Sequence, residues 1–204
     1  MKQVLFLECS PHANDSLGAQ QVRSAIGDLE SGNPGFRVSA RHLALDPIPP
    51  LSAQYAHAIT SRASADSPAF LWSERLIGEL ESSDGLLIST PMHNFAVPAA
   101  LKLWIDHVLR KGRSIKLASE GEIGTPRDRP ALVLVRSGSF ILGKNAWQPD
   151  FLTPYLRHVL SVLGIHRVQF EYLSGEFPSA DALAQVRRAL ASFLIFSPIP
   201  GEPS

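Results

Sequence analysis

The sequence lacks the features that mark several large protein classes. It holds a single cysteine, Cys9, so no disulfide can form within the chain and a reducing compartment, the cytoplasm, is expected. No apolar run approaches the roughly 20 residues of a membrane-spanning helix, and the apolar start at residues 3–7 is too short for a signal peptide. Lys and Arg number 19, Asp and Glu also 19, so the zero net charge predicts no nucleic-acid or membrane partner.

Several catalytic and binding signatures are missing as well. No Gly-x-Gly-x-x-Gly follows the first strand, which argues against NAD(P)H as a resident cofactor, and no Gly-x-Ser-x-Gly elbow indicates a hydrolase. The seven histidines show no pair at metal-ligand spacing, so no metal is expected. Residues 138–145 nearly spell a Walker A loop, but Asn145 stands where Ser or Thr would bind magnesium, and Pro149 follows where a helix should run.

Apolar strands alternate with helical segments along the rest of the chain. Five buried strands are predicted at 3–7, 36–43, 85–89, 131–135 and 168–172. Helices are predicted to begin near Ser16, at Ser67-Pro68 with Ser67 as N-cap, near Pro98, at Thr153-Pro154 and near Ala180. Residues 46–50 are expected to form a surface connection, and 113–129 a loop or small hairpin.

This alternation predicts an α/β fold with one doubly wound domain, a five-stranded parallel sheet covered by helices on both faces. The domain is expected to span residues 1–197, and a Pro-rich tail, 198–204, to follow it. Leu71, Ile77 and Leu80 are expected on the inner face of the helix that follows Ser67.

Small and polar residues gather where three of the strands end. Residues 10–18 follow the first strand, 91–95 the third and 136–139 the fourth. Ligands of open parallel sheets bind beyond the carboxyl ends of the strands, where the strand order reverses, so these loops predict one site. The first loop leads into a helix N-terminus, which suits a phosphate. The alternative is that its serines only cap the helix.

Residues 85–110, GLLISTPMHNFAVPAALKLWIDHVLR, resemble the signature segment of the FMN-dependent NADH-azoreductases and related NAD(P)H:quinone reductases. In that family a strand ends in Pro-Met-aromatic-Asn-Phe and a Leu-Lys-x-Trp/Tyr-x-Asp helix follows. The matching residues are Pro91, Met92, Asn94, Phe95, Leu101, Lys102 and Asp106. Ser10 and Ser16 match the family's first loop, and 152–156 its Leu-Thr-Pro-Tyr-Leu run, so the resemblance covers nearly the whole chain.

The resemblance implies a flavodoxin-like fold, bound FMN, and two-electron ping-pong transfer of hydride from NADH or NADPH to a quinone, azo compound or nitroaromatic. The flavin carries this chemistry, so no catalytic side chain is expected. The implied phosphate contacts are Ser10, Ser16, Leu17 and Gly18. The implied ring contacts are Pro91, Met92, His93, Asn94 and Phe95, and those near the pyrimidine side are Arg136, Ser137, Gly138 and Ser139.

Three positions depart from the family pattern. Gly18 replaces a third phosphate-binding serine, His93 replaces a more frequent tyrosine, and Ser137 stands where glycine is common. These departures leave open an alternative, a flavodoxin-like FMN-binding sensor or partner-binding module without reductase turnover.

The family also implies a homodimer, with the helix over 97–110 near the two-fold contact. This helix carries more apolar residues than one face against a sheet requires, among them Trp104, which suggests that a second face is covered. We therefore expect Trp104 at the dimer contact. The alternative is that Trp104 packs within the monomer.

Overall fold

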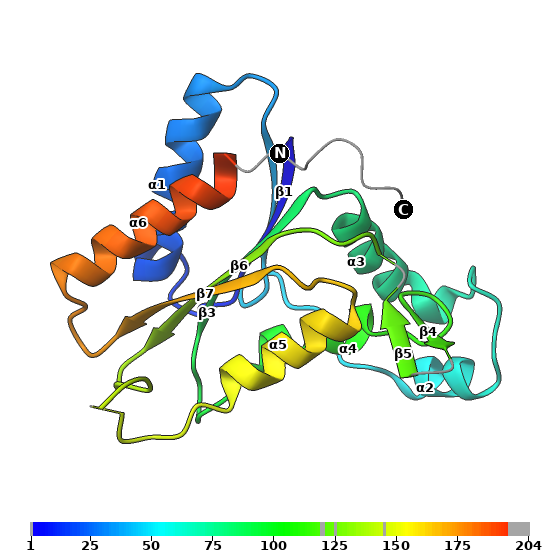
Figure 1. Cartoon of the computed structure of the whole chain (residues 1–204). Helices are drawn as coiled ribbons and strands as arrows, with labels where there is room; N and C mark the ends of the chain where they lie inside the picture. Colours follow the sequence, from blue (N-terminus) through cyan, green and yellow to red (C-terminus); the bar gives the residue numbers. More distant parts are fainter. Residues whose placement is uncertain (1, 119–120, 125, 145, 196–204) are drawn as a thin grey trace.

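Five parallel strands form the central sheet in the order β2-β1-β3-β6-β7 (Figure 1). The structure is a computed structural model and describes residues 2–118, 121–124, 126–144 and 146–195, so the tail expected at 198–204 lies outside the described residues. The strands are β1 (Gln3–Glu8), β2 (Arg37–His42), β3 (Gly85–Pro91), β6 (Ala131–Ser137) and β7 (Val168–Ser174). The predicted five-stranded parallel sheet is confirmed, and its first, third and fourth strands along the chain are neighbours.

The three central strands are buried on both faces, as their continuous apolar runs predict. β2 and β7 lie at the edges of the sheet and are only partly buried, so the expectation of five buried strands is wrong for these two. An edge strand has a neighbour on one side only, and its side chains therefore remain within reach of water.

Helices cover both faces of the sheet (Figure 1). On one face lie α1 (Leu17–Gly32) and α6 (Ala180–Ile195), and on the other α3 (Leu71–Glu81), α4 (Ala99–Val108) and α5 (Leu152–Val162). Each face has its own apolar core, because successive strand residues point to opposite sides. Val4 and Phe6 pack toward α1 and α6, while Leu5 and Leu7 pack toward the other layer.

Local signals account for some of the helix ends. The Ser16 hydroxyl caps α1 by accepting the Ala19 N–H at 3.5 Å, and Gly164, with φ +82°, follows the end of α5. Ser67 makes no capping hydrogen bond: Pro68–Phe70 forms a 3-10 turn (η2), and α3 begins after it. Leu71 and Leu80 both lie in α3, and at 3.6 residues per turn they point to opposite sides of it. Leu71 is therefore 71% exposed, and its predicted inner position is wrong. Ile77 and Leu80 are buried as predicted.

Two elements lie between the main ones. A short helix, α2 (Ala53–Thr60), follows the Pro-rich connection and was not predicted; its N-cap is Ser52, whose hydroxyl accepts the Tyr55 N–H at 3.1 Å. Only Tyr55 and Ala58 of α2 are buried, which leaves too short a pattern to show a helix in the sequence. The hairpin of β4 (Ile115–Ala118) and β5 (Gly121–Gly124) lies within 113–129, where a loop or small hairpin was predicted. In the described part of the chain no helix has the length and apolarity to cross a bilayer.

Trp104 lies in the core of the monomer with 0% of its surface exposed. The expectation that it forms a dimer contact is therefore wrong, and the alternative of packing within the chain is correct. The neighbouring His107 shows what covers the outer side of α4. Its Nε2 lies 2.9 Å from the Pro49 carbonyl oxygen, and its ring meets Tyr55 edge-on. The connection over 46–50 and α2 thus cover the second apolar face of α4.

Candidate cofactor site

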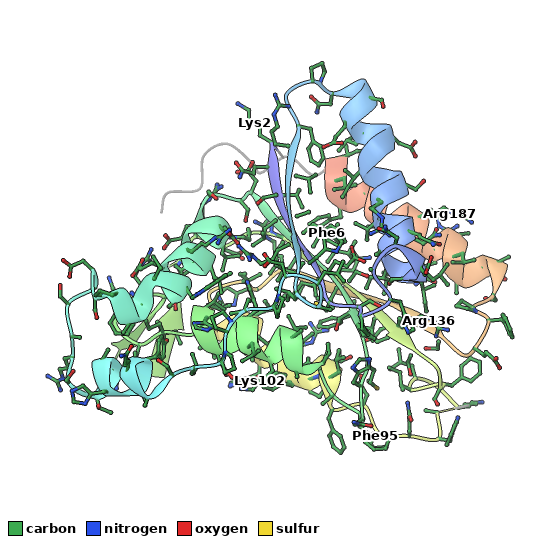
Figure 2. The ribbon with its side chains drawn as sticks, turned by 180° about the vertical axis from the view of Figure 1, so that it is seen from behind. Lys2, Phe6, Phe95, Lys102, Arg136 and Arg187 are labelled. Carbon is green, nitrogen blue, oxygen red and sulfur yellow. The ribbon has the colours of Figure 1, made fainter. Side chains whose placement is uncertain are left out.

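The loops after β1, β3 and β6 meet at one edge of the sheet. The Cys9 N–H donates to the Ser89 carbonyl at 2.9 Å, and the Met92 N–H donates to the Arg136 carbonyl at 2.8 Å, so each loop leaves its strand beside the next. Figure 2 shows Arg136 and Phe95 at this end of the molecule, with Lys2 at the opposite end. The sheet therefore brings together the three predicted segments 10–18, 91–95 and 136–139.

The first loop presents hydrogen-bond donors at a helix N-terminus. Ser10 and Ser16 are both buried; the Ser10 hydroxyl accepts the His12 N–H at 3.2 Å, and Ser16 caps α1. The capping alternative is thus correct for Ser16, yet each hydroxyl keeps its own proton to donate. The N–H groups of Leu17 and Gly18 belong to the first helical turn, which has no carbonyl to offer them. This set of donors at the positive end of a helix fits a phosphate group.

Gly18 is the point at which α1 comes nearest to the sheet. A Cβ atom at this position would lie 2.8 Å from the Ser89 Oγ and 3.6 Å from the Leu134 Cδ2. A serine here would direct its Cβ at the sheet and collide with the Ser89 hydroxyl. The departure from a third serine is therefore explained by packing, and position 18 offers its backbone N–H to a ligand.

The second loop is a tight turn. His93 and Ala96 each donate their N–H to the carbonyl of the other at 3.0 Å, and between them Asn94 and Phe95 have φ +48° and φ +73°. Two successive positive φ values are those of a type I′ turn. Asparagine adopts this conformation readily, whereas a bulky residue such as Phe95 is rarely found in it. The Phe151 N–H donates to the Phe95 carbonyl at 3.2 Å and ties the turn to the start of α5.

The side chains of this turn differ in burial. Met92 is half-buried and packs against the core, while His93, Asn94 and Phe95 are exposed at the sheet edge. Phe95 is thus not a core residue. A strained, hydrogen-bonded turn that holds an amide and an aromatic ring outward is suited to contact a planar ligand.

In the third loop the side chain of Arg136 turns away from the first two loops. Its guanidinium donates to the carbonyls of Ser137, Leu173 at 3.1 Å and Glu176 at 3.0 Å, and burial lowers its pKa. The loop therefore offers a ligand its backbone N–H groups and serine hydroxyls. The Ser137 hydroxyl is buried and accepts the Ser139 N–H at 3.2 Å, which fixes this turn.

Gln148 joins the second and third loops and was not predicted. Its Nε2 lies 3.4 Å from the Ser137 Oγ and 4.0 Å from the Met92 Sδ. A glutamine in a polar loop carries no sequence signal of its own, so only the fold could identify it. Cys9, by contrast, is buried, and burial raises the pKa of its thiol, which leaves it unreactive.

Comparisons with known proteins agree with this fold. A family model described as a flavodoxin-like fold matches residues 2–194. The FMN-dependent NADH:quinone oxidoreductase 5 of Burkholderia lata is 52% identical over 191 residues, which cover 94% of each chain. The FMN-dependent NADH:quinone oxidoreductase 4 of Pseudomonas fluorescens is 47% identical over 203 residues, which cover 98% of each.

Solved structures show the same fold. The FMN-dependent NADH-azoreductase from Bacillus anthracis, solved in complex with FMN, matches with a TM-score of 0.78 and 20% identity. The match covers 94% of this chain and 99% of that one.

Proposed function

The chain belongs to the family of proteins with a flavodoxin-like fold, and we propose on that premise that it is an FMN-dependent NADH:quinone oxidoreductase. One observation of the structure carries this proposal: the donor-rich first turn of α1 and the rigid turn over 93–96 meet at the same sheet edge. Relatives named as oxidoreductases at 52% and 47% identity support it. They do not favour a sensor or binding module without turnover.

We assign the phosphate of FMN to the first loop. The hydroxyls of Ser10 and Ser16 and the N–H groups of Leu17 and Gly18 supply donors there, and the helix dipole favours the negative charge. Gly18 contributes because its missing side chain lets α1 begin close to β3. We further propose that residues 1–197 act as one FMN-binding domain.

We assign the flavin ring to the other two loops. Residues 91–95 line the ring, with the Asn94 amide at its polar edge, and residues 136–139 lie near its pyrimidine side. Bound FMN would supply the redox chemistry, which is hydride transfer from NADH to the acceptor. The protein groups position the ring, and the backbone N–H groups of the third loop stabilise negative charge near it.

We place NADH on the exposed side of the 93–96 turn, and the acceptor at the same position after the oxidised nicotinamide has left. Because the two substrates share one position, they bind in turn, in ping-pong order. The relatives' names indicate NADH as donor and a quinone as acceptor. Azo compounds or nitroaromatics fit the same place because they too are planar and conjugated. We place the protein in the cytoplasm.

A homodimer completes this proposal. Six large apolar side chains are exposed in the described parts of the loops after β3, β6 and β7, beside the candidate site: Phe95, Phe140, Leu142, Trp147, Phe151 and Phe177. Apolar groups gathered in this way mark a surface that another molecule covers. We propose that a second copy covers them and completes each flavin pocket. Sedimentation should show a dimer at micromolar concentration, and Phe151→Glu should produce monomers.

The experiment on function starts with the colour of the purified protein. We expect flavin absorbance, FMN as the extracted flavin, anaerobic bleaching by NADH and recovery on addition of a quinone. A colourless protein that fails to bind added FMN would overturn the proposal. Retention of FMN without bleaching by NADH would instead support the sensor.

A second experiment tests the phosphate assignment. Ser16→Asp should retain the fold, because an anion still suits a helix N-terminus, but should lower FMN affinity by repulsion. Unchanged FMN affinity in this variant would remove the phosphate role from the first loop.

A further inference from the structure

A buried carboxylate lies directly behind the first loop. Glu8, the last residue of β1, is 1% exposed and faces α1. Its Oε2 accepts from the Arg23 Nη1 at 2.8 Å and lies 3.1 Å from the Nδ1 of His42, the residue beside it on β2. Its Oε1 is buried and has no hydrogen-bond partner among the residues that the structure describes. Glu8 is therefore held from one side only, by groups on α1 and β2.

Burial of this carboxylate lowers the free energy of unfolding. Burial raises the pKa of the Glu8 carboxyl, against the attraction of His42 and Arg23. A carboxylate at this position lowers stability unless a cation is held against it. Glu8 fixes the position of the Arg23 guanidinium. The Arg23 side chain is about one third exposed and would otherwise move freely.

The other end of the same guanidinium reaches the first loop. The Arg23 Nη2 donates to the Asn14 carbonyl at 3.1 Å, and the Gln20 Nε2 donates to the same oxygen at 2.9 Å. Asn14 lies in the 3-10 turn Ala13–Asp15 (η1), between Ser10 and Ser16. Two donors on α1 thus hold this carbonyl oxygen against the helix. A carbonyl oxygen turned the other way would face the phosphate position and repel it.

We propose that Arg23, held by Glu8, is a positioning residue for the FMN phosphate. It fixes the turn over 13–15 so that the loop presents N–H and hydroxyl groups to the phosphate. The inference rests on the proposed function, since it requires FMN at this site. It assigns Arg23 no contact with the flavin ring or with either substrate.

Riboflavin, which lacks the phosphate, separates this role from general stability. The full-length protein is stripped of flavin, and the Kd values of FMN and riboflavin are measured from flavin fluorescence. We expect Arg23→Met to raise the Kd of FMN by about tenfold and leave that of riboflavin unchanged, because the variant loses two charge-assisted hydrogen bonds. Arg187→Met, on an exposed arginine of α6 (Figure 2), is the matched control and should change neither.

Two further variants keep the test decisive. Arg23→Lys has a single ammonium group and cannot reach both Glu8 and Asn14 with a planar fork. FMN binding should therefore weaken relative to riboflavin binding in this variant too, and the test stands even if Arg23→Met does not fold. Glu8→Gln should weaken FMN binding in the wild-type background. In the Arg23→Met background it should leave the ratio of the FMN Kd to the riboflavin Kd unchanged.

The failures of the two proposals are distinguishable. Wild-type protein that binds FMN no better than riboflavin would overturn the phosphate site itself. Wild-type preference for FMN that survives in both Arg23 variants would overturn the role of Arg23 alone. Equal weakening of both flavins, with a lower Tm, would show a merely structural role and also overturn it.

Discussion

Replacing Gly18 by alanine should destabilise this protein, and removing one oxygen atom elsewhere should reverse the effect. The Cβ of Gly18→Ala would lie 2.8 Å from the Ser89 Oγ, shorter than any ordinary contact. Ser89 is buried, so its hydroxyl must rotate into packed surroundings or α1 must move away from β3. In the Ser89→Ala background the nearest remaining atom is the Leu134 Cδ2 at 3.6 Å, a normal contact distance.

The size of the effect follows from two opposing contributions. Overpacking a buried site by one carbon costs about 1–3 kcal/mol, whereas a Gly to Ala change at a compatible helical position gains about 0.4–1 kcal/mol. The single variant Gly18→Ala should therefore lose about 0.5–2 kcal/mol of unfolding free energy. With Ser89→Ala present, the same substitution should be neutral or gain up to about 1 kcal/mol.

Urea unfolding of the four proteins of this double-mutant cycle measures the effect, and FMN Kd values accompany it. Because the shift of α1 also moves the N–H groups of its first turn, FMN should bind more weakly to Gly18→Ala and recover in the double variant. The same loss of stability from Gly18→Ala in both backgrounds would refute the packing explanation. A double variant that regains stability while FMN binding stays weak would separate packing from the phosphate site.

Three further predictions concern other parts of the molecule. Asn94→Gly and Asn94→Leu should both weaken FMN binding through loss of the amide, but only the leucine should lower stability, by about 1–2 kcal/mol, because φ there is +48°; equal stability of the two would contradict the turn. Trp104→Ala should cost about 3–5 kcal/mol of unfolding free energy, as for a large core residue, and a variant that dissociates without losing stability would contradict its burial in the monomer. Burial acts to raise the pKa of Asp84, but hydrogen bonds from Arg127 and from the backbone N–H groups of Lys2 and Gln3 outweigh it and hold that pKa below its usual value. Asp84 thus adds stability above its unfolded pKa that is lost as the pH falls through the folded pKa, so Asp84→Asn should destabilise at pH 7 and not at about pH 2; an equal deficit at both pH values would exclude this linkage.

The parts that local patterns predict are the ones that depend on few neighbours. Continuous apolar runs mark β1, β3 and β6 because these strands are buried on both faces. The residues of each strand alone are enough to predict this burial. The convergence of the loops at 10–18, 91–95 and 136–139 follows from topology, since parallel strands carry their C-terminal ends to one edge. The segment 91–95 needed a resemblance to connect it with FMN.

Contacts between distant segments had to come from the tertiary structure. Whether Trp104 faces a second copy or its own chain depends on what covers α4, and the residues that cover it begin far earlier in the sequence. In the sequence, Gly18 only indicates that a serine hydroxyl is missing. The structure shows Ser89 opposite it, too close for a Cβ atom at position 18.

The bridge from Glu8 through Arg23 to Asn14 joins a strand, a helix and a loop, and no periodic pattern marks any of the three. Apolar periodicity reports which side of an element avoids water, and so the sequence by itself determined the sheet, the two core layers and the edge where the site lies. The partner that meets each buried side chain depends on how the elements are placed in space, and only the fold decided that.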